Sequence, residues 1–327
     1  MSGLAVHLLL VGAVALVVSL VLAPLESLGW WAGWLGPEDA PDTPDPPPHA
    51  VHGDRPAAFV VFLSGIGSIS GDALLPSEAA FLDRLQAALP RARIVRDVFP
   101  YAPSGRPLLT GQRVFSWFWR RVEAGRLSGR HLLPALLNLR NLFQVMVSAD
   151  HRYGPLYSFG IARVARERLE AHGFVPGCGI PVVLLGSSGG GQISVGAATY
   201  LGAEIGETPA IVTFGGVMCS DRGLTEVTRL VSLYGRGDRV YALGRAAFPG
   251  RWAMAAGSFW NAARREDRLV EREIGPMGHS GAGGYLDRRP RPGGEPYFEV
   301  TVREVAAAVE AVLVAPQPPS TMSISTG

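Results

Sequence analysis

The chain has 327 residues, of which 47% are hydrophobic and 18% charged, and its formal net charge at pH 7 is +2. This length suits one large domain with appendages, and so small a charge gives no reason to expect a nucleic-acid partner. All 30 basic residues are arginine, which excludes a P-loop lysine, a Schiff-base lysine and a Ser–Lys dyad. Two cysteines, Cys178 and Cys219, define neither a disulfide framework nor a metal site. We expect no metal and no cofactor.

An apolar stretch at residues 4–23 opens the chain, with only two polar interruptions. As a helix it would span about 30 Å, the thickness of a bilayer core. No basic residue precedes it, and Pro24 follows its only small-residue cleavage site, so an uncleaved anchor is favoured over a secretory signal peptide. Residues 1–24 therefore predict a single-pass membrane protein with the lipid bilayer as a partner. The first arginine is Arg55, too distant to decide on which side of the membrane the remaining chain lies.

Composition divides the rest of the chain into three parts. Residues 25–56 hold three closely spaced tryptophans, typical of a membrane interface, and then a proline-rich spacer. Residues 57–315 have the apolar periodicity of one folded domain, interrupted by an insert at about residues 105–150. Residues 316–327 have the composition of a disordered tail.

Within the folded domain, short apolar strands alternate with helices. Strands are predicted at residues 57–63, 93–99, 180–185, 210–214, 230–234 and 268–274, and helices at 76–89, 155–172 and 297–314. This alternation predicts an α/β fold with a mostly parallel sheet and helices on both faces. Functional residues of such sheets lie in loops at the carboxyl ends of the strands.

The most informative stretch, residues 181–198, reads PVVLLGSSGGGQISVGAA. It predicts a buried strand, a very tight turn and a helix, with Ser188 at the centre of a G-x-S-x-G match. Side chains two residues before and after Ser188 would collide across this turn, and glycine at 186 and 190 removes them. Unpaired N–H groups at the helix start can hold a developing oxyanion. Taken alone, the motif also fits a glycine-rich turn that cradles phosphate.

A serine nucleophile needs a general base, and the base needs an orienting acid. Asp238 lies just past one predicted strand, and His279 lies in a glycine-rich loop past the next. Asp221, which follows an earlier strand, is a rival for the acid. The chain order Ser188, Asp238, His279 is that of α/β-hydrolases.

On these motifs the chain resembles serine hydrolases of the α/β-hydrolase fold over about residues 57–314. The resemblance implies that Ser188 is the nucleophile, His279 the general base and Asp238 its partner. The two opening strands that are common in the family have no counterpart here, so the resemblance implies a shortened sheet.

The resemblance also implies an oxyanion hole formed by the N–H of Gly189 and a second N–H in the loop after the first strand. Ile66 and Gly65 are the candidates for this second donor. Ser64-Gly65 stands where many members of the family have His-Gly, which leaves the exact donor open.

The insert lies where hydrolases often carry a cap. Its aromatic cluster, which includes Trp117 and Trp119 beside arginines, suits an interfacial surface or an apolar acyl pocket. An ordinary packed helix explains the cluster equally well. His151, just past the insert, is a further candidate for the substrate pocket.

The sequence therefore predicts a membrane-anchored serine hydrolase, similar to carboxylesterases and lipases, that cleaves a lipophilic ester through an acyl-enzyme. Acyl transfer, thioester cleavage and peptide cleavage remain open because they share this intermediate. A non-catalytic, membrane-tethered binding protein with a hydrolase fold is the alternative from another class.

Overall fold

A computed structural model describes residues 55–67, 74–101 and 132–314, together with His7 and Val14. The predicted anchor at residues 1–24, nearly all of the spacer at 25–56, the tail from residue 316, and Trp117 and Trp119 lie outside the described residues. In the part of the chain that is described, none of the helices has the length and hydrophobicity that a membrane crossing requires.

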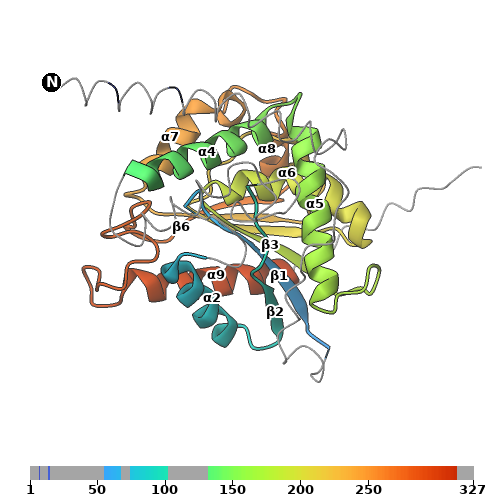
Figure 1. Ribbon diagram of the computed structural model, residues 1–327, viewed down its shortest axis with the longest axis horizontal. Coiled ribbons are helices and arrows are strands. Elements are labelled where there is room, and N and C mark those ends of the chain that lie inside the picture. Colours follow the sequence, from blue (N-terminus) through green and yellow to red (C-terminus); the bar gives the residue numbers. More distant parts are fainter. Residues whose placement is uncertain (1–6, 8–13, 15–54, 68–73, 102–131, 315–327) are drawn as a thin grey trace, which may run out of the picture.

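The centre of the described part is a six-stranded sheet in which every neighbouring pair is parallel (Figure 1). The strand order is β2-β1-β3-β4-β5-β6. The strands are β1 (Ala58–Leu63), β2 (Ala92–Val95), β3 (Val182–Ser187), β4 (Ala210–Phe214), β5 (Leu230–Tyr234) and β6 (Leu269–Glu273). This confirms the predicted α/β class with a parallel sheet.

The strand predicted at residues 93–99 is wrong in its second half, since β2 ends at Val95. Beyond that point Oδ1 of Asp97 lies 3.0 Å from Nε2 of His172, the residue that follows helix α5 (Gly154–Ala171). Its Oδ2 lies 3.5 Å from Nη1 of Arg168 in α5, so this segment takes part in a tertiary ion pair that the apolar pattern does not encode.

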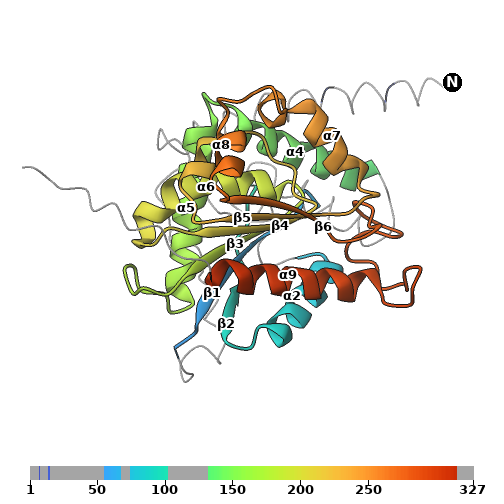
Figure 2. The same ribbon diagram turned by 180° about the vertical axis from the view of Figure 1, so that it is seen from behind.

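Helices cover both faces of the sheet (Figures 1 and 2). One face carries α2 (Pro76–Ala88) and α9 (Tyr297–Val314). The other carries α4 (Leu132–Ala149), α5 (Gly154–Ala171), α6 (Gly190–Ile205), α7 (Arg239–Ala247) and α8 (Phe259–Arg265). The prediction of helices on both faces is confirmed, although α7 and α8 were not among the expected elements.

The core consists of two apolar layers, one on each side of the sheet. Successive strand side chains point to opposite faces, so Phe59 and Val61 of β1 pack in the α5–α6 layer, whereas Val60 and Phe62 pack in the α2–α9 layer. All six β1 side chains are fully buried. This burial on both faces explains why the strands read as continuous apolar runs.

A buried ion pair joins the segment after β5 to β6. The Arg251 side chain is 2% exposed, and its Nη2 lies 3.0 Å from Oε1 of Glu271. Its guanidinium carbon lies 4.0 Å from the ring centroid of Trp260. It also lies 5.2 Å from the ring centroid of Tyr241. The charge is thus withdrawn from water and balanced by one carboxylate and two aromatic faces.

We expect Arg251→Ala to lower the free energy of unfolding by about 3 kcal/mol, because Glu271 then loses its buried cationic partner and, within the described residues, keeps only the more distant, exposed Arg264, 3.9 Å away. The matched control is Arg236→Ala, which breaks an exposed pair with Glu273 (side chains 77% and 34% exposed). This control is expected to leave stability essentially unchanged. Urea unfolding monitored by circular dichroism measures the free energy of unfolding of both variants. An equal loss of stability in the two would contradict the larger contribution expected of the buried pair.

Candidate active site

Ser188 occupies the turn between β3 and α6, with a φ of 51°. Residues other than glycine rarely adopt this left-handed conformation. The turn is held by the Ser188 N–H, which donates to the Phe214 carbonyl over 3.3 Å, and by the Ser188 carbonyl, which accepts from the N–H groups of Gly191 and Val217. These bonds maintain the strained backbone and present the hydroxyl at the carboxyl edge of the sheet.

The glycines on either side of Ser188 are required for two different reasons. A Cβ on Gly186 would lie 2.8 Å from the carbonyl oxygen of Gly190, which is the collision across the turn that the sequence predicts. A Cβ on Gly190 would lie 2.1 Å from the carbonyl oxygen of Leu63 in β1. The second glycine therefore allows α6 to approach the neighbouring strand.

Gly190→Ala is expected to cost about 3 kcal/mol of folding stability or more, because the clash involves backbone atoms that cannot move aside. Gly202→Ala, in the same helix, is the control, since its Cβ would meet nothing closer than 3.5 Å. Alanine there should be neutral or stabilise the protein by up to about 1 kcal/mol. Thermal unfolding compares the stability of the two variants. A Gly190→Ala protein as stable as the wild type would contradict the close contact between the start of α6 and β1.

His279 connects Ser188 to Asp238. Its Nε2 lies 2.8 Å from Oγ of Ser188, and its Nδ1 lies 2.9 Å and 3.0 Å from the two carboxylate oxygens of Asp238. The loops after β5 and β6 are joined by the Arg236 N–H, which donates to the Gly275 carbonyl over 2.8 Å. Because β3, β4, β5 and β6 are neighbours, the loops that follow them meet at one edge of the sheet.

Asp238 is held as an acceptor by several donors. Its side chain is fully buried. Its oxygens accept from the Tyr241 N–H over 2.8 Å and from the Tyr285 hydroxyl over 2.7 Å. Burial alone would raise the pKa of Asp238, but the hydrogen bonds from His279, the Tyr241 N–H and Tyr285 hold it below its usual value. An ionised Asp238 accepts from Nδ1–H, which leaves Nε2 free to take a proton from Ser188.

Asp221, the rival acid, lies elsewhere. Its carboxylate accepts from the Gly223 N–H over 2.8 Å and from the Gln192 side chain over 3.3 Å. It caps the 3₁₀ turn Arg222–Thr225, and burial raises its pKa. Of the two acids that the sequence leaves open, Asp238 is the one that contacts His279.

The N–H groups of Gly189 and Ile66, beside Ser188, have no acceptor within the described residues. The two residues are adjacent, since a Cβ on Gly189 would lie 3.1 Å from Cγ2 of Ile66. The Ile66 carbonyl accepts from the Asn141 side chain over 2.7 Å, which fixes the loop. The Gly65 N–H instead donates to Glu78 over 3.2 Å. The Ile66 N–H is therefore the donor of this loop that is left without a protein acceptor among the described residues.

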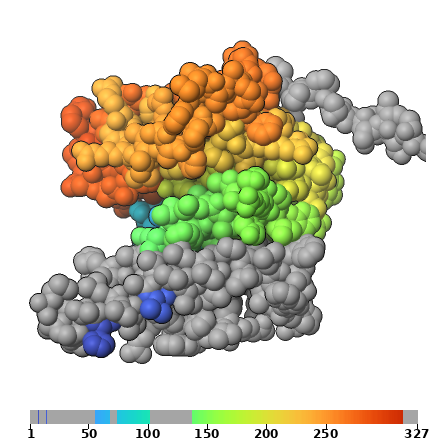
Figure 3. Space-filling model, turned by 90° about the horizontal axis from the view of Figure 1, so that it is seen from above, coloured from blue at the N-terminus to red at the C-terminus, as the bar shows by residue number. Residues whose placement is uncertain are grey.

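The described end of the insert, α4, packs against α6 beside the Ser188 turn. Its Val145 side chain would lie 2.7 Å from a Cβ at Gly189. Figure 3 shows α4 in green next to the α7–α8 segment in orange on this side of the molecule. Apolar atoms of Val145 and Ile66 thus border the turn.

Of the three expected substrate-binding residues only His151 is described, and it does not lie at the Ser188 turn. His151 is exposed in the turn that joins α4 to α5, and no contact links it to Ser188, His279 or Asp238. Trp117 and Trp119 fall outside the described residues.

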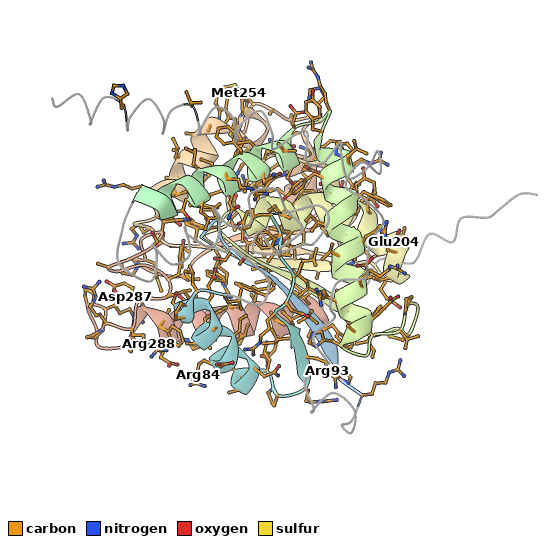
Figure 4. All side chains as sticks on the ribbon, in the orientation of Figure 1. Arg84, Arg93, Glu204, Met254, Asp287 and Arg288 are labelled. Carbon is orange, nitrogen blue, oxygen red and sulfur yellow. The ribbon has the colours of Figure 1, made fainter. Side chains whose placement is uncertain are left out.

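Two surface hollows in the described part lie away from these side chains. One, of about 270 Å³, is lined by Arg55, Arg93 and Cys178 among others. The other, of about 550 Å³, lies between α2 and α9 and includes Arg84 and Arg288 (Figure 4). Neither is lined by Ser188, His279 or Asp238. The candidate site is therefore defined by its polar contacts and not by cavity size.

The sequence did not indicate the two tyrosines that hold Asp238. Tyr285 follows His279 by six positions in a loop, and Tyr241 lies in the unexpected helix α7. A capping signal was available for α7, because Asp238 accepts the Tyr241 N–H as its N-cap.

No protein-family model and no curated protein matches this chain. Among solved structures, it is similar to a protein from Xanthomonas campestris pv. campestris that is provisionally described as a hydrolase of the alpha/beta superfamily. That likeness has 17% sequence identity and a TM-score of 0.32, and covers 78% of this chain and 99% of the other. A Thermus thermophilus protein is similar with 16% identity and a TM-score of 0.36, over 80% of this chain and 92% of the other. Similarity at this level leaves the function to be inferred from the geometry of this chain.

Proposed function

We propose that this protein is a serine hydrolase that cleaves a carboxylic ester through an acyl-enzyme, with Ser188 as nucleophile, His279 as general base and Asp238 as its orienting partner. The observation that best supports this is the continuous hydrogen-bonded chain from Oγ of Ser188 through His279 to Asp238, with links of 2.8 Å and 2.9 Å. A strained serine, a base in contact with it and a buried acid behind the base are the parts that acyl transfer to serine requires.

In the proposed reaction, Oγ of Ser188 attacks the ester carbonyl carbon while its proton passes to Nε2 of His279. The N–H groups of Gly189 and Ile66 donate to the oxyanion of the tetrahedral intermediate, and one such donor is worth about 10²–10³ in rate. His279 then gives the proton to the departing alkoxide. Water attacks the resulting acyl-enzyme with the same assistance and releases the carboxylic acid.

The proposal extends to a lipophilic acyl group and to a membrane-anchored protein. Val145 and Ile66 supply apolar atoms at the Ser188 turn. The insert that ends in α4 is rich in apolar and aromatic residues, and residues 4–23 have the composition of a membrane anchor. These features together fit a lipophilic substrate that enters the site from a lipid bilayer.

Pre-steady-state hydrolysis of nitrophenyl esters tests the proposal on the full-length protein in detergent. A series from acetate to laurate should give a burst of nitrophenol close to one equivalent of protein, with the highest kcat/KM for the longer acyl chains. Ser188→Ala should give no burst. Absence of both burst and turnover along the whole series would overturn the proposed ester hydrolysis. If an added alcohol is converted to a new ester, the activity would be acyl transfer and not hydrolysis.

A further inference from the structure

The hydroxyl of Tyr285 lies between Asp238 and the loop after β5. Its oxygen is 2.7 Å from Oδ2 of Asp238 and 2.8 Å from the backbone nitrogen of Gly235. The Gly235 N–H can only donate, and an ionised carboxylate can only accept. The single proton of the hydroxyl must therefore point at Oδ2, so the direction of this hydrogen bond is fixed.

The ring of Tyr285 is held in place by close neighbours. It is 3% exposed. Gly215, with a φ of 59°, lies so near that a Cβ there would be 2.6 Å from Cε2 of the tyrosine. The Thr301 hydroxyl donates to the Tyr285 carbonyl over 2.8 Å, and the His279 ring meets the tyrosine ring edge-on with centroids 6.4 Å apart. The hydroxyl thus has little freedom to leave Asp238.

Each oxygen of Asp238 has a donor besides His279. Oδ1 accepts from the Tyr241 N–H, and Oδ2 accepts from Tyr285. Rotation of the carboxylate would break one of these bonds without replacing it in a buried place. The charged groups nearby, Arg251 and Glu271, meet the Tyr241 side chain and not Asp238 itself. Burial and the Asp238 charge raise the pKa of Tyr285, which keeps its hydroxyl protonated as a donor.

We propose that Tyr285 is a positioning residue that acts through Asp238: its hydroxyl fixes the plane of the carboxylate and thereby the orientation of His279 towards Ser188. This inference builds on the proposed hydrolase function. No contact joins Tyr285 to Ser188, and within the described residues its hydroxyl binds Gly235 and Asp238.

Tyr285→Phe removes the hydroxyl and keeps the ring. We expect kcat for ester hydrolysis to fall about 10- to 100-fold, the usual worth of a hydrogen bond to a charged group, with KM within about twofold. In an Asp238→Asn background, the same change should alter kcat by less than about twofold, since the group it acts through is already lost. Tyr157→Phe is the control. It also removes a buried hydroxyl, one that donates to the Pro100 carbonyl, and it should lower stability without lowering kcat.

The His279 Nδ1 proton supplies a second readout. Its downfield NMR resonance should move in Tyr285→Phe and stay in Tyr157→Phe. A kcat within twofold of wild type, or equal losses in the wild-type and Asp238→Asn backgrounds, would overturn the positioning role. Failure of the proposed function is recognised separately, because either the wild type would then show no turnover or Ser188→Ala would keep the wild-type turnover, whatever the Tyr285 variants do.

Discussion

Replacing Ser188 by alanine is expected to lower kcat for ester hydrolysis by about 10⁵- to 10⁶-fold, because the variant lacks the atom to which the acyl group is transferred. The protein should remain folded, since alanine keeps the Cβ that the turn already accommodates. Steady-state kinetics with the best ester of the nitrophenyl series measures the loss.

The neighbouring serine provides the control. Ser187 ends β3 and is 9% exposed, but His279 bonds to Ser188. Ser187→Ala should therefore keep kcat within a few-fold of wild type. Equal activity of the two variants would exclude Ser188 as the nucleophile.

Asp238→Asn should lower kcat by about 10⁴-fold with little change in the fold. The amide of asparagine can donate to Nδ1 of His279, which stabilises the tautomer whose Nε2 carries a proton and cannot accept one from Ser188. The kinetic loss should appear in kcat and kcat/KM alike, as expected for an interaction made in the transition state.

Asp221→Asn is the matched comparison. The asparagine oxygen can still accept the Gly223 N–H that Asp221 binds, so kcat should stay within a few-fold of wild type. A larger loss of kcat in Asp221→Asn than in Asp238→Asn would identify Asp221 as the acid of the triad. It would also contradict the hydrogen bonds between His279 and Asp238.

Much of the sheet was predictable from sequence because its strands are buried on both faces. The ranges 210–214 and 230–234 match β4 and β5 as observed. Continuous apolar runs bounded by polar or glycine residues are the pattern that such strands require. The pattern failed at β2, where Asp97 belongs to a tertiary contact with α5, and at α7, whose signal was the cap at Asp238.

The sequence predicted which residues form the candidate site better than it predicted which other residues bind them. Chain order and position past strand ends pointed to Ser188, Asp238 and His279. Choosing between Asp238 and Asp221, or between Ile66 and Gly65, needed the contacts of Glu78 and Gln192, which no local pattern encodes. Tyr285 was invisible for the same reason, since its partners come from distant loops. The membrane anchor and the roles of Trp117 and Trp119 stay predictions.

Labelling with a fluorophosphonate followed by peptide mapping tests the nucleophile most directly. In this reaction the serine oxygen displaces fluoride from phosphorus, and only a hydroxyl activated by a neighbouring base reacts quickly. We expect one adduct on the peptide that contains Ser188, retained in Ser187→Ala, slowed by a competing ester and lost in Ser188→Ala. No adduct on the folded wild type, or equal labelling of Ser188→Ala, would contradict the hydrolase account.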